Sequence, residues 1–354
     1  MFIRPYLQIY LYTLLLPSLG ILQAQTVSTE PVGYITLTIN GSPDGTTPAF
    51  TALSAGLQNA AVVTGSITSN ATSAVLTDST ANNETNAYAA TDAAGNSSYF
   101  IQITSGANEG LIFDILSNDA KTYTTGTDLN GIVSAGDTYA VKAHLTLADV
   151  FGAANETGLK SAGSPSDSDT IYLMSSTGNG LFATYYYLTD EFGFFNGDGW
   201  RSVTDFNTDY SNLVVGPDDG LIVRRIASGD LTTVVSGNVS TVDLKRDLPN
   251  GFSLVAYPFP VDVTLADSGI YSATNGYVSA GSSADSDIVY VIKPNGTFSS
   301  YYYLTDEFGF FSGDGWRTVA DPNTPVDDTL IPTGSSIIIK HIGSGLAWAD
   351  AIPF

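Results

Sequence analysis

One segment of the chain occurs twice and is almost unchanged between its two copies. The sequence YYYLTDEFGFFNGDGWR begins at Tyr185 and YYYLTDEFGFFSGDGWR begins at Tyr301, and they differ only at Asn196 and Ser312. The shorter motifs TLAD and DSD precede both copies in the same order. A shared order of motifs over this length predicts duplication of a whole domain, longer than a solenoid repeat. We therefore expect repeat A over residues 136–250 and repeat B over residues 251–354.

Short β-branched runs separated by turn residues dominate the remaining sequence. The clearest are GYITLTI, YFIQIT, GLIVRRI, DIVYVI and SIIIKHI, and runs of this kind are typical of strands. The segment LTLADVFGAANETGLK has room for one short turn of helix. The pattern predicts an all-β fold of tandem small β-sandwich or open-barrel domains. Residues 25–135 form a separate N-terminal β-region, which is a candidate for a third, degenerate copy.

The first residues predict export. Arg4 precedes an apolar run from Leu7 to Ile21, and Leu22-Gln23-Ala24 is a suitable small-residue cleavage site. This pattern is typical of a secretory signal peptide over residues 1–24, with an uncleaved anchor as the alternative. No later stretch is long and apolar enough to predict a transmembrane helix. We expect a secreted or cell-surface protein.

Charge and cysteine content restrict the function classes. The formal net charge is −23, from 35 acidic and 12 basic residues, and the chain has 0 Cys. Nucleic-acid binding needs a basic surface, so we expect no nucleic-acid partner. Anionic membranes are disfavoured for the same reason. The missing cysteines exclude disulfides, thiolate catalysis and cysteine metal sites.

The order of several segments resembles an uncharacterised family of secreted bacterial proteins. The segments are PVGYITLTING, YFIQITSGANEGLIFDI, GDTYAVKAHLTLADVF, GWR and GLIVRR. The resemblance implies export from a bacterium and a β-rich body. It implies no activity and carries over no catalytic residue. Members of the family often have a shorter turn before GWR, so TDEFGFFNGDG goes beyond the family's pattern.

Three interpretations of the duplicated segment stay open. The first is a constrained turn, because its glycines allow positive φ and its NG and DG pairs are strong hairpin signals. The second is a Ca²⁺ site, because a hard cation takes six or more oxygen ligands. The candidate ligands are Asp190, Glu191, Asn196 and Asp198, with Asp306, Glu307 and Asp314 in the second copy.

The third interpretation is a binding platform for a polysaccharide or another cell-surface component. Aromatic ring faces can stack on sugars while acids and amides bind hydroxyl groups, and two copies would provide avidity. The candidate platform residues are Tyr185, Tyr187 and Trp200, with Tyr301, Tyr303 and Trp316 in the second copy. The alternative for the two tryptophans is a buried, structural position.

The leading functional prediction is a non-catalytic protein with a structural, adhesive or glycan-binding role. The alternative is an extracellular polysaccharide hydrolase, because such an enzyme needs only two suitably placed carboxylates. Asp190 or Glu191 with Asp198 is the first candidate pair. We find no nucleophile elbow and no zinc-type histidine spacing in the sequence.

Overall fold

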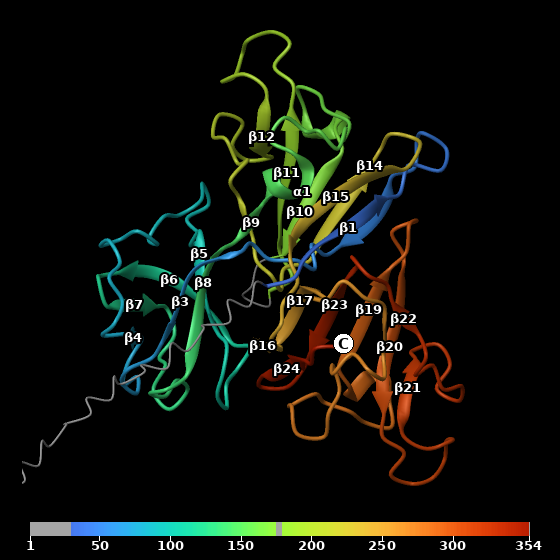
Figure 1. Ribbon diagram of the computed structural model, residues 1–354. Helices are drawn as coiled ribbons and strands as arrows, with labels where there is room; N and C mark the ends of the chain where they lie inside the picture. Colours follow the sequence, from blue (N-terminus) through green and yellow to red (C-terminus); the bar gives the residue numbers. More distant parts are fainter. Residues whose placement is uncertain (1–29, 175–178, 354) are drawn as a thin grey trace, which may run out of the picture.

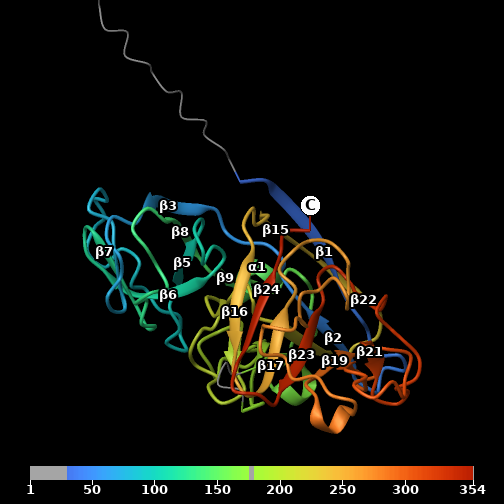
Figure 2. The ribbon, with the colours of Figure 1, turned by 90° about the horizontal axis from the view of Figure 1, so that it is seen from below.

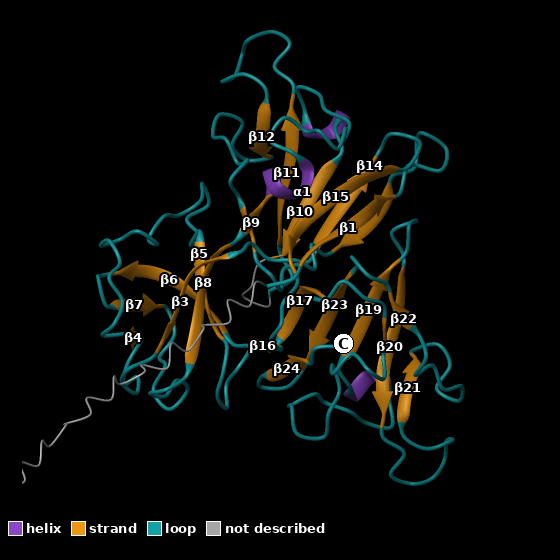
Figure 3. Ribbon diagram, viewed as in Figure 1, coloured by secondary structure: helices purple, strands orange, loops and turns teal. Residues whose placement is uncertain are grey.

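The computed structural model describes residues 30–174 and 179–353, and the chain there is all-β, as predicted. Its strands form several separate, open sheets, and helix is confined to a few short turns (Figure 3). The predicted short turn of helix is α1 (Leu147–Phe151), which Thr146 caps. No helix within the described ranges could cross a membrane. The predicted signal peptide lies outside these ranges.

The first of three domains, domain A, is assembled from two separate parts of the chain. Strands β1 and β2 come from the N-terminal part, and β9 to β15 come from beyond residue 144. Its main sheet has the order β12-β11-β10-β14-β2, and β1 pairs with β15. Its strands are β1 (Val32–Ile39), β2 (Ala49–Leu53), β9 (Leu145–Thr146), β10 (Thr170–Met174), β11 (Phe182–Leu188), β12 (Gly199–Ser202), β13 (Val214–Val215), β14 (Leu221–Arg225) and β15 (Leu231–Asn238).

Domain B is continuous and has the same strand order. Its main sheet runs β17-β23-β19-β20-β21, so β17 takes the place that β2 has in domain A, and β16 pairs with β24 as β1 pairs with β15. Its strands are β16 (Leu244–Leu248), β17 (Gly251–Ala256), β18 (Val263–Thr264), β19 (Ile288–Ile292), β20 (Phe298–Leu304), β21 (Gly315–Thr318), β22 (Leu330–Ile331), β23 (Ser336–His341) and β24 (Leu346–Asp350).

The insert domain lies in the chain between β2 and β9 and has its own core. Its sheet has the order β3-β8-β5-β6-β7-β4, and it projects to one side of the other two domains (Figures 1 and 2). This strand order differs from that of domains A and B. Its strands are β3 (Ala61–Ser66), β4 (Val75–Thr77), β5 (Tyr99–Ile103), β6 (Ile112–Asn118), β7 (Thr122–Thr125) and β8 (Thr138–Ala143).

The sheets therefore divide the chain differently from the boundaries at 135/136 and 250/251. Residues 32–57 and 145–235 share one hydrophobic core, while the core of domain B begins at Leu248. The N-terminal region is the start of domain A followed by an insertion, so the sequence-based boundaries needed correction. The duplication covers one discontinuous and one continuous domain.

The main sheets of domains A and B pack against each other. Ile222, Leu254 and Ile338 form the buried centre of this interface. Phe50 of β2 lies against Gly296 of domain B, and Phe252 of β17 lies against Gly180 of domain A. These reciprocal contacts give the pair a pseudo-twofold relationship. Equivalent loops of the two domains consequently point in different directions.

Candidate functional site

The duplicated segment forms the β11–β12 hairpin in domain A and the β20–β21 hairpin in domain B. Tyr187 pairs with Trp200 across the first hairpin, and Tyr303 pairs with Trp316 across the second. Trp200 is 0% exposed and Trp316 is 1% exposed. The prediction that these tryptophans stack on a surface ligand is therefore wrong, because each fills the core of its own domain.

The four predicted platform tyrosines also pack against protein. Tyr185 and Tyr187 contact the core of domain A, and Tyr301 and Tyr303 contact the core of domain B. The rings of Tyr187 and Trp200 meet edge to face at 5.4 Å, a geometry that stabilises aromatic pairs. Six aromatic side chains that we expected on one exposed platform thus belong mainly to the cores.

The acids of the segment brace its loop. The Asp190 carboxylate accepts hydrogen bonds from the backbone N–H groups of Phe194 (2.8 Å), Phe195 (3.0 Å) and Gly197 (3.3 Å), and Asp198 accepts one from the Asp190 N–H (2.8 Å). Charge-assisted bonds of this kind are stronger than neutral ones. They fix the course of a loop that has no regular secondary structure.

The second copy repeats this bracing almost unchanged. The Asp306 carboxylate accepts bonds from the N–H groups of Phe310 (2.8 Å), Phe311 (3.0 Å) and Gly313 (3.3 Å). Asp314 accepts from the Asp306 N–H at 2.7 Å. The loops therefore share one internal structure, although they belong to different domains.

The arginine of the GWR motif supplies further hydrogen bonds that brace the loop. The buried Arg201 donates to the carbonyl oxygens of Gly197, Trp200 and Phe206, and Arg317 makes the corresponding bonds in domain B. Gly199 has φ +156°, and an added Cβ would lie 2.7 Å from the Arg201 guanidinium. The constrained-turn interpretation thus accounts for the glycine and arginine of GWR and for the aspartates of the loop, and the core position of the tryptophan accounts for the third residue of the motif.

The geometry does not support the predicted Ca²⁺ site. Asp190 and Asp198 direct carboxylate oxygens to backbone N–H groups, Asn196 donates its amide to the Asn207 carbonyl, and Glu191 is exposed. Glu307 is exposed in the same way, and Asp306 and Asp314 repeat the backbone contacts. In the part of the chain that the structure describes, no three His, Cys, Asp or Glu side chains are grouped to hold a metal ion.

The braced loops present a pair of phenylalanines that the sequence analysis did not single out. Phe192 and Phe194 are 77% and 79% exposed, and Phe308 and Phe310 are 77% and 80% exposed. The rings of each pair are tilted by 32°, with centroids 5.9 and 5.8 Å apart. The identity of FGFF in both copies was the available signal. Neither the core nor the brace explains the exposed rings.

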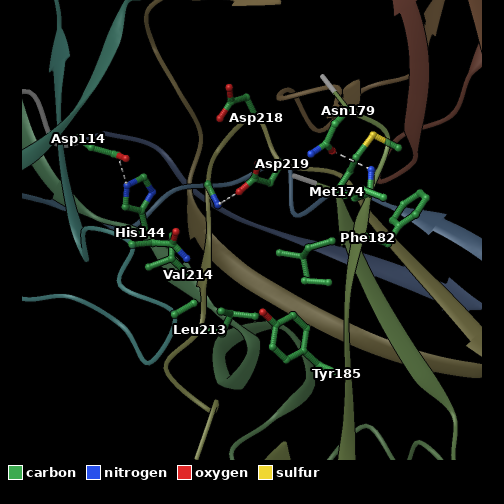
Figure 4. Close-up of a pocket in the computed structure, with 16 residues that line it drawn as sticks. Asp114, His144, Met174, Asn179, Phe182, Tyr185, Leu213, Val214, Asp218 and Asp219 are labelled. Atoms are coloured by element: carbon green, nitrogen blue, oxygen red, sulfur yellow. Dashed lines mark hydrogen bonds and ion pairs between the residues drawn. The ribbon is translucent and has the colours of Figure 1, made fainter. Parts of the chain in front are cut away.

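A groove lies between the insert domain and domain A (Figure 4). It encloses about 590 Å³. Asp114 of β6 and His144, between β8 and β9, contribute from one side, and Asp218 and Asp219 contribute from the loop before β14. Tyr185, which we predicted as a ligand residue, also lines the groove. Sequence reasoning could not assemble this site, because its lining residues come from several segments that are far apart in the chain.

Two of the groove acids have partners within the protein. The His144 Nε2 lies 3.0 Å from the Asp114 carboxylate, and Asp219 accepts a hydrogen bond from the Gly216 N–H at 2.7 Å. Burial raises the pKa of Asp219 to about 6, and the negative charge of Asp218 contributes to this shift. Removal of a carboxylate from water favours its neutral form, as does a like charge nearby.

No protein-family model, curated protein or solved structure matches this chain. The resemblance to a family of secreted bacterial proteins stays a prediction from the sequence.

Proposed function

We propose that this protein is a secreted or cell-surface, non-catalytic adhesive protein that binds polysaccharide through its two braced loops. The observation that carries the proposal is the pair of exposed phenylalanines on each loop, at residues 192 and 194 and at residues 308 and 310. Burial of a phenylalanine side chain stabilises a protein by about 1.5–3 kcal/mol. Four such rings remain in water here, on loops that are held rigid.

The exposed side chains of these loops are chemically suited to bind sugar rings. An aromatic face stacks on the apolar C–H face of a sugar, and acidic groups beside it accept hydroxyl hydrogen bonds. Glu191 and Glu307 are exposed beside the phenylalanine pairs and supply such acceptors. Because the loops are braced before binding, little conformational entropy is lost when a ligand binds.

The arrangement of the two loops favours the bridging of two polymer chains by one protein molecule. The β11–β12 loop lies at the top of Figure 1 and the β20–β21 loop at the bottom. Two sites that face different directions can bind two polymer chains, which fits an adhesive role. The candidate hydrolase pair was Asp190 or Glu191 with Asp198. The carboxylates of Asp190 and Asp198 bond to the loop backbone, which favours the non-catalytic function.

Co-sedimentation with microcrystalline cellulose and with chitin tests the proposal. We expect the wild-type protein to pellet with at least one polymer and to clump its particles. Phe192→Ala/Phe194→Ala should retain binding through the other loop but lose clumping. Loss of all four phenylalanines should reduce binding by about tenfold or more, since burial of even one phenylalanine ring contributes about 1.5–3 kcal/mol.

A matched control removes exposed phenylalanines elsewhere. Phe182 and Phe298 are 41% and 48% exposed at the starts of β11 and β20, away from the loops. Phe182→Ala/Phe298→Ala should bind and clump as the wild type does. Pelleting that survives removal of all four loop rings would contradict the proposal. Release of reducing ends would contradict its non-catalytic part and favour the hydrolase.

A further inference from the structure

The carboxylates that line the groove between the insert domain and domain A give it a negative charge. Three carboxylates line it, from Asp114, Asp218 and Asp219, and no lysine or arginine is among the described residues of its wall. Leu181 and Phe182, at 64% and 41% exposed, lie at its edge. A groove of this size suits a small organic ligand. Its lining combines negative charge with apolar side chains.

His144 supplies an independent indication of a ligand. Its side chain is 5% exposed, and its Nδ1 is buried without a hydrogen-bond partner. The Asp114 carboxylate can only accept, so a neutral His144 carries its proton on Nε2 and leaves Nδ1 as an acceptor. In Figure 4, Asp114 lies on one side of the ring and Asp219 on the other. An unpartnered buried acceptor is costly, and a ligand N–H group would satisfy it.

The turn that carries Asp218 and Asp219 is acidic in domain A but not in domain B. Strands β13 and β22 are equivalent, and the turns that follow them lead into the equivalent strands β14 and β23. Domain A has Asp218-Asp219 in this turn, where domain B has Gly334-Ser335. Ser335 closes the turn through a hydroxyl bond to Pro332. A domain of this fold therefore forms the turn without these acids.

We propose that this groove binds a small organic cation, an ammonium group on an aliphatic stem. The ammonium donates hydrogen bonds to Asp219 and to Nδ1 of His144, and the stem lies against the apolar wall that includes Leu181. Asp114 and Asp218 add attraction at longer range. This site is separate from the phenylalanine loops, and the proposal does not depend on their function.

The proposal predicts a pH dependence. The charged or titratable groups around Asp219 are Asp218 on its own loop, Asp114 of β6, His144 after β8, and Arg246 of β16, which bonds to the Asp218 carbonyl oxygen. Burial and the nearby charge of Asp218 raise the pKa of Asp219 to about 6, so its carboxyl gains negative charge as the pH rises through this range. Cation binding should therefore strengthen as the pH rises through about 6, because Asp219 gains its negative charge there.

Calorimetric titration of the full chain with 1,5-diaminopentane tests this proposal, with 1,5-pentanediol as the neutral molecule of the same length. The diamine stays fully charged across this pH range, so changes in affinity report on the protein. We expect the diamine to bind about tenfold or more tightly than the diol. Asp219→Ser, which installs the domain B residue, should weaken diamine binding about tenfold, the usual scale for one charged hydrogen bond.

Two controls separate this site from general attraction to an acidic protein. Asp285→Asn removes one exposed charge from domain B and should leave diamine affinity unchanged. If Asp219→Ser does not fold, Leu181→Lys adds a positive charge at the groove edge, and it should weaken binding where Leu181→Gln does not. Equal binding of diamine and diol, or equal losses in Asp219→Ser and Asp285→Asn, would overturn the proposal.

Discussion

At the scale of single residues, two aspartates explain why the loops are so alike. Asp190 and Asp306 each hold three backbone N–H groups, and the distances agree in both copies. A glutamate or asparagine would change the reach or the charge of this contact. The sequence showed that the acids were retained in both copies but not which groups they contact, so metal binding and loop bracing looked equivalent.

Asp190→Ala should make the β11–β12 loop more mobile. We expect the free energy of unfolding in urea to fall by about 1–2 kcal/mol, because three charge-assisted hydrogen bonds are lost near the surface. Chymotrypsin should also cleave faster after Phe192 or Phe194. Glu191→Ala is the matched control, since Glu191 is exposed, and it should change stability by less than about 0.5 kcal/mol. Equal proteolysis of the two variants would exclude the bracing role.

At the scale of elements, the sequence was a reliable guide. The predicted run Gly33–Ile39 is β1, and the runs at 99–104, 220–226, 287–292 and 336–342 are β5, β14, β19 and β23. Strong β-propensity and clear turns made these segments predictable. The ion pair between Arg225 and Asp169 is a different case: Asp169 lies 56 positions away in the sequence, and its side chain is 0% exposed, so a buried pair of this kind could not be predicted from the sequence.

Domain B has His341 and Asp287 where domain A has Arg225 and Asp169, and this substitution provides a test. In both domains the aspartate also accepts a backbone N–H bond from the residue after the arginine or histidine, Ile226 or Ile342. Arg225→Ala should lower the free energy of unfolding by about 3–5 kcal/mol, because a buried aspartate loses its partner.

Arg225→His should lower stability less than Arg225→Ala, since the equivalent pair in domain B shows that a histidine can hold this aspartate. Urea unfolding of both variants measures the difference. The reverse change, His341→Arg, serves as a control for the size of the side chain. If Arg225→His were as destabilising as Arg225→Ala, the Arg225–Asp169 and His341–Asp287 contacts would not be structurally equivalent.

At the scale of the whole molecule, the sequence did not reveal how the chain is divided. The segments AFTAL of β2 and GFSLVA of β17 occupy equivalent places, but they share too few residues to be recognised as copies. Packing tolerates exchange among apolar residues of similar volume, so such strands drift while their position persists. The groove escaped prediction for a related reason, because the insertion brings Asp114 against a turn of domain A.

The insertion itself can be tested, because its two ends lie together. The Asn59 side-chain amide donates to the carbonyl oxygens of Ala143 (3.4 Å) and His144 (3.1 Å). A domain inserted between adjacent chain positions is usually separable. We therefore expect a chain in which about four Gly and Ser residues replace residues 60–143 to keep domains A and B folded, with a β-sheet circular dichroism spectrum and cooperative urea unfolding.

The shortened chain also separates the two proposed sites. Removal of Asp92 leaves the Val214 N–H without its acceptor, which should lower stability by about 1–3 kcal/mol. Polymer clumping through the phenylalanine loops should persist, because both hairpins belong to the retained domains. Diamine binding should weaken, because Asp114, which bonds to His144, and one wall of the groove are absent. A shortened chain that folds and still binds diamine as the full chain does would place that site outside the groove.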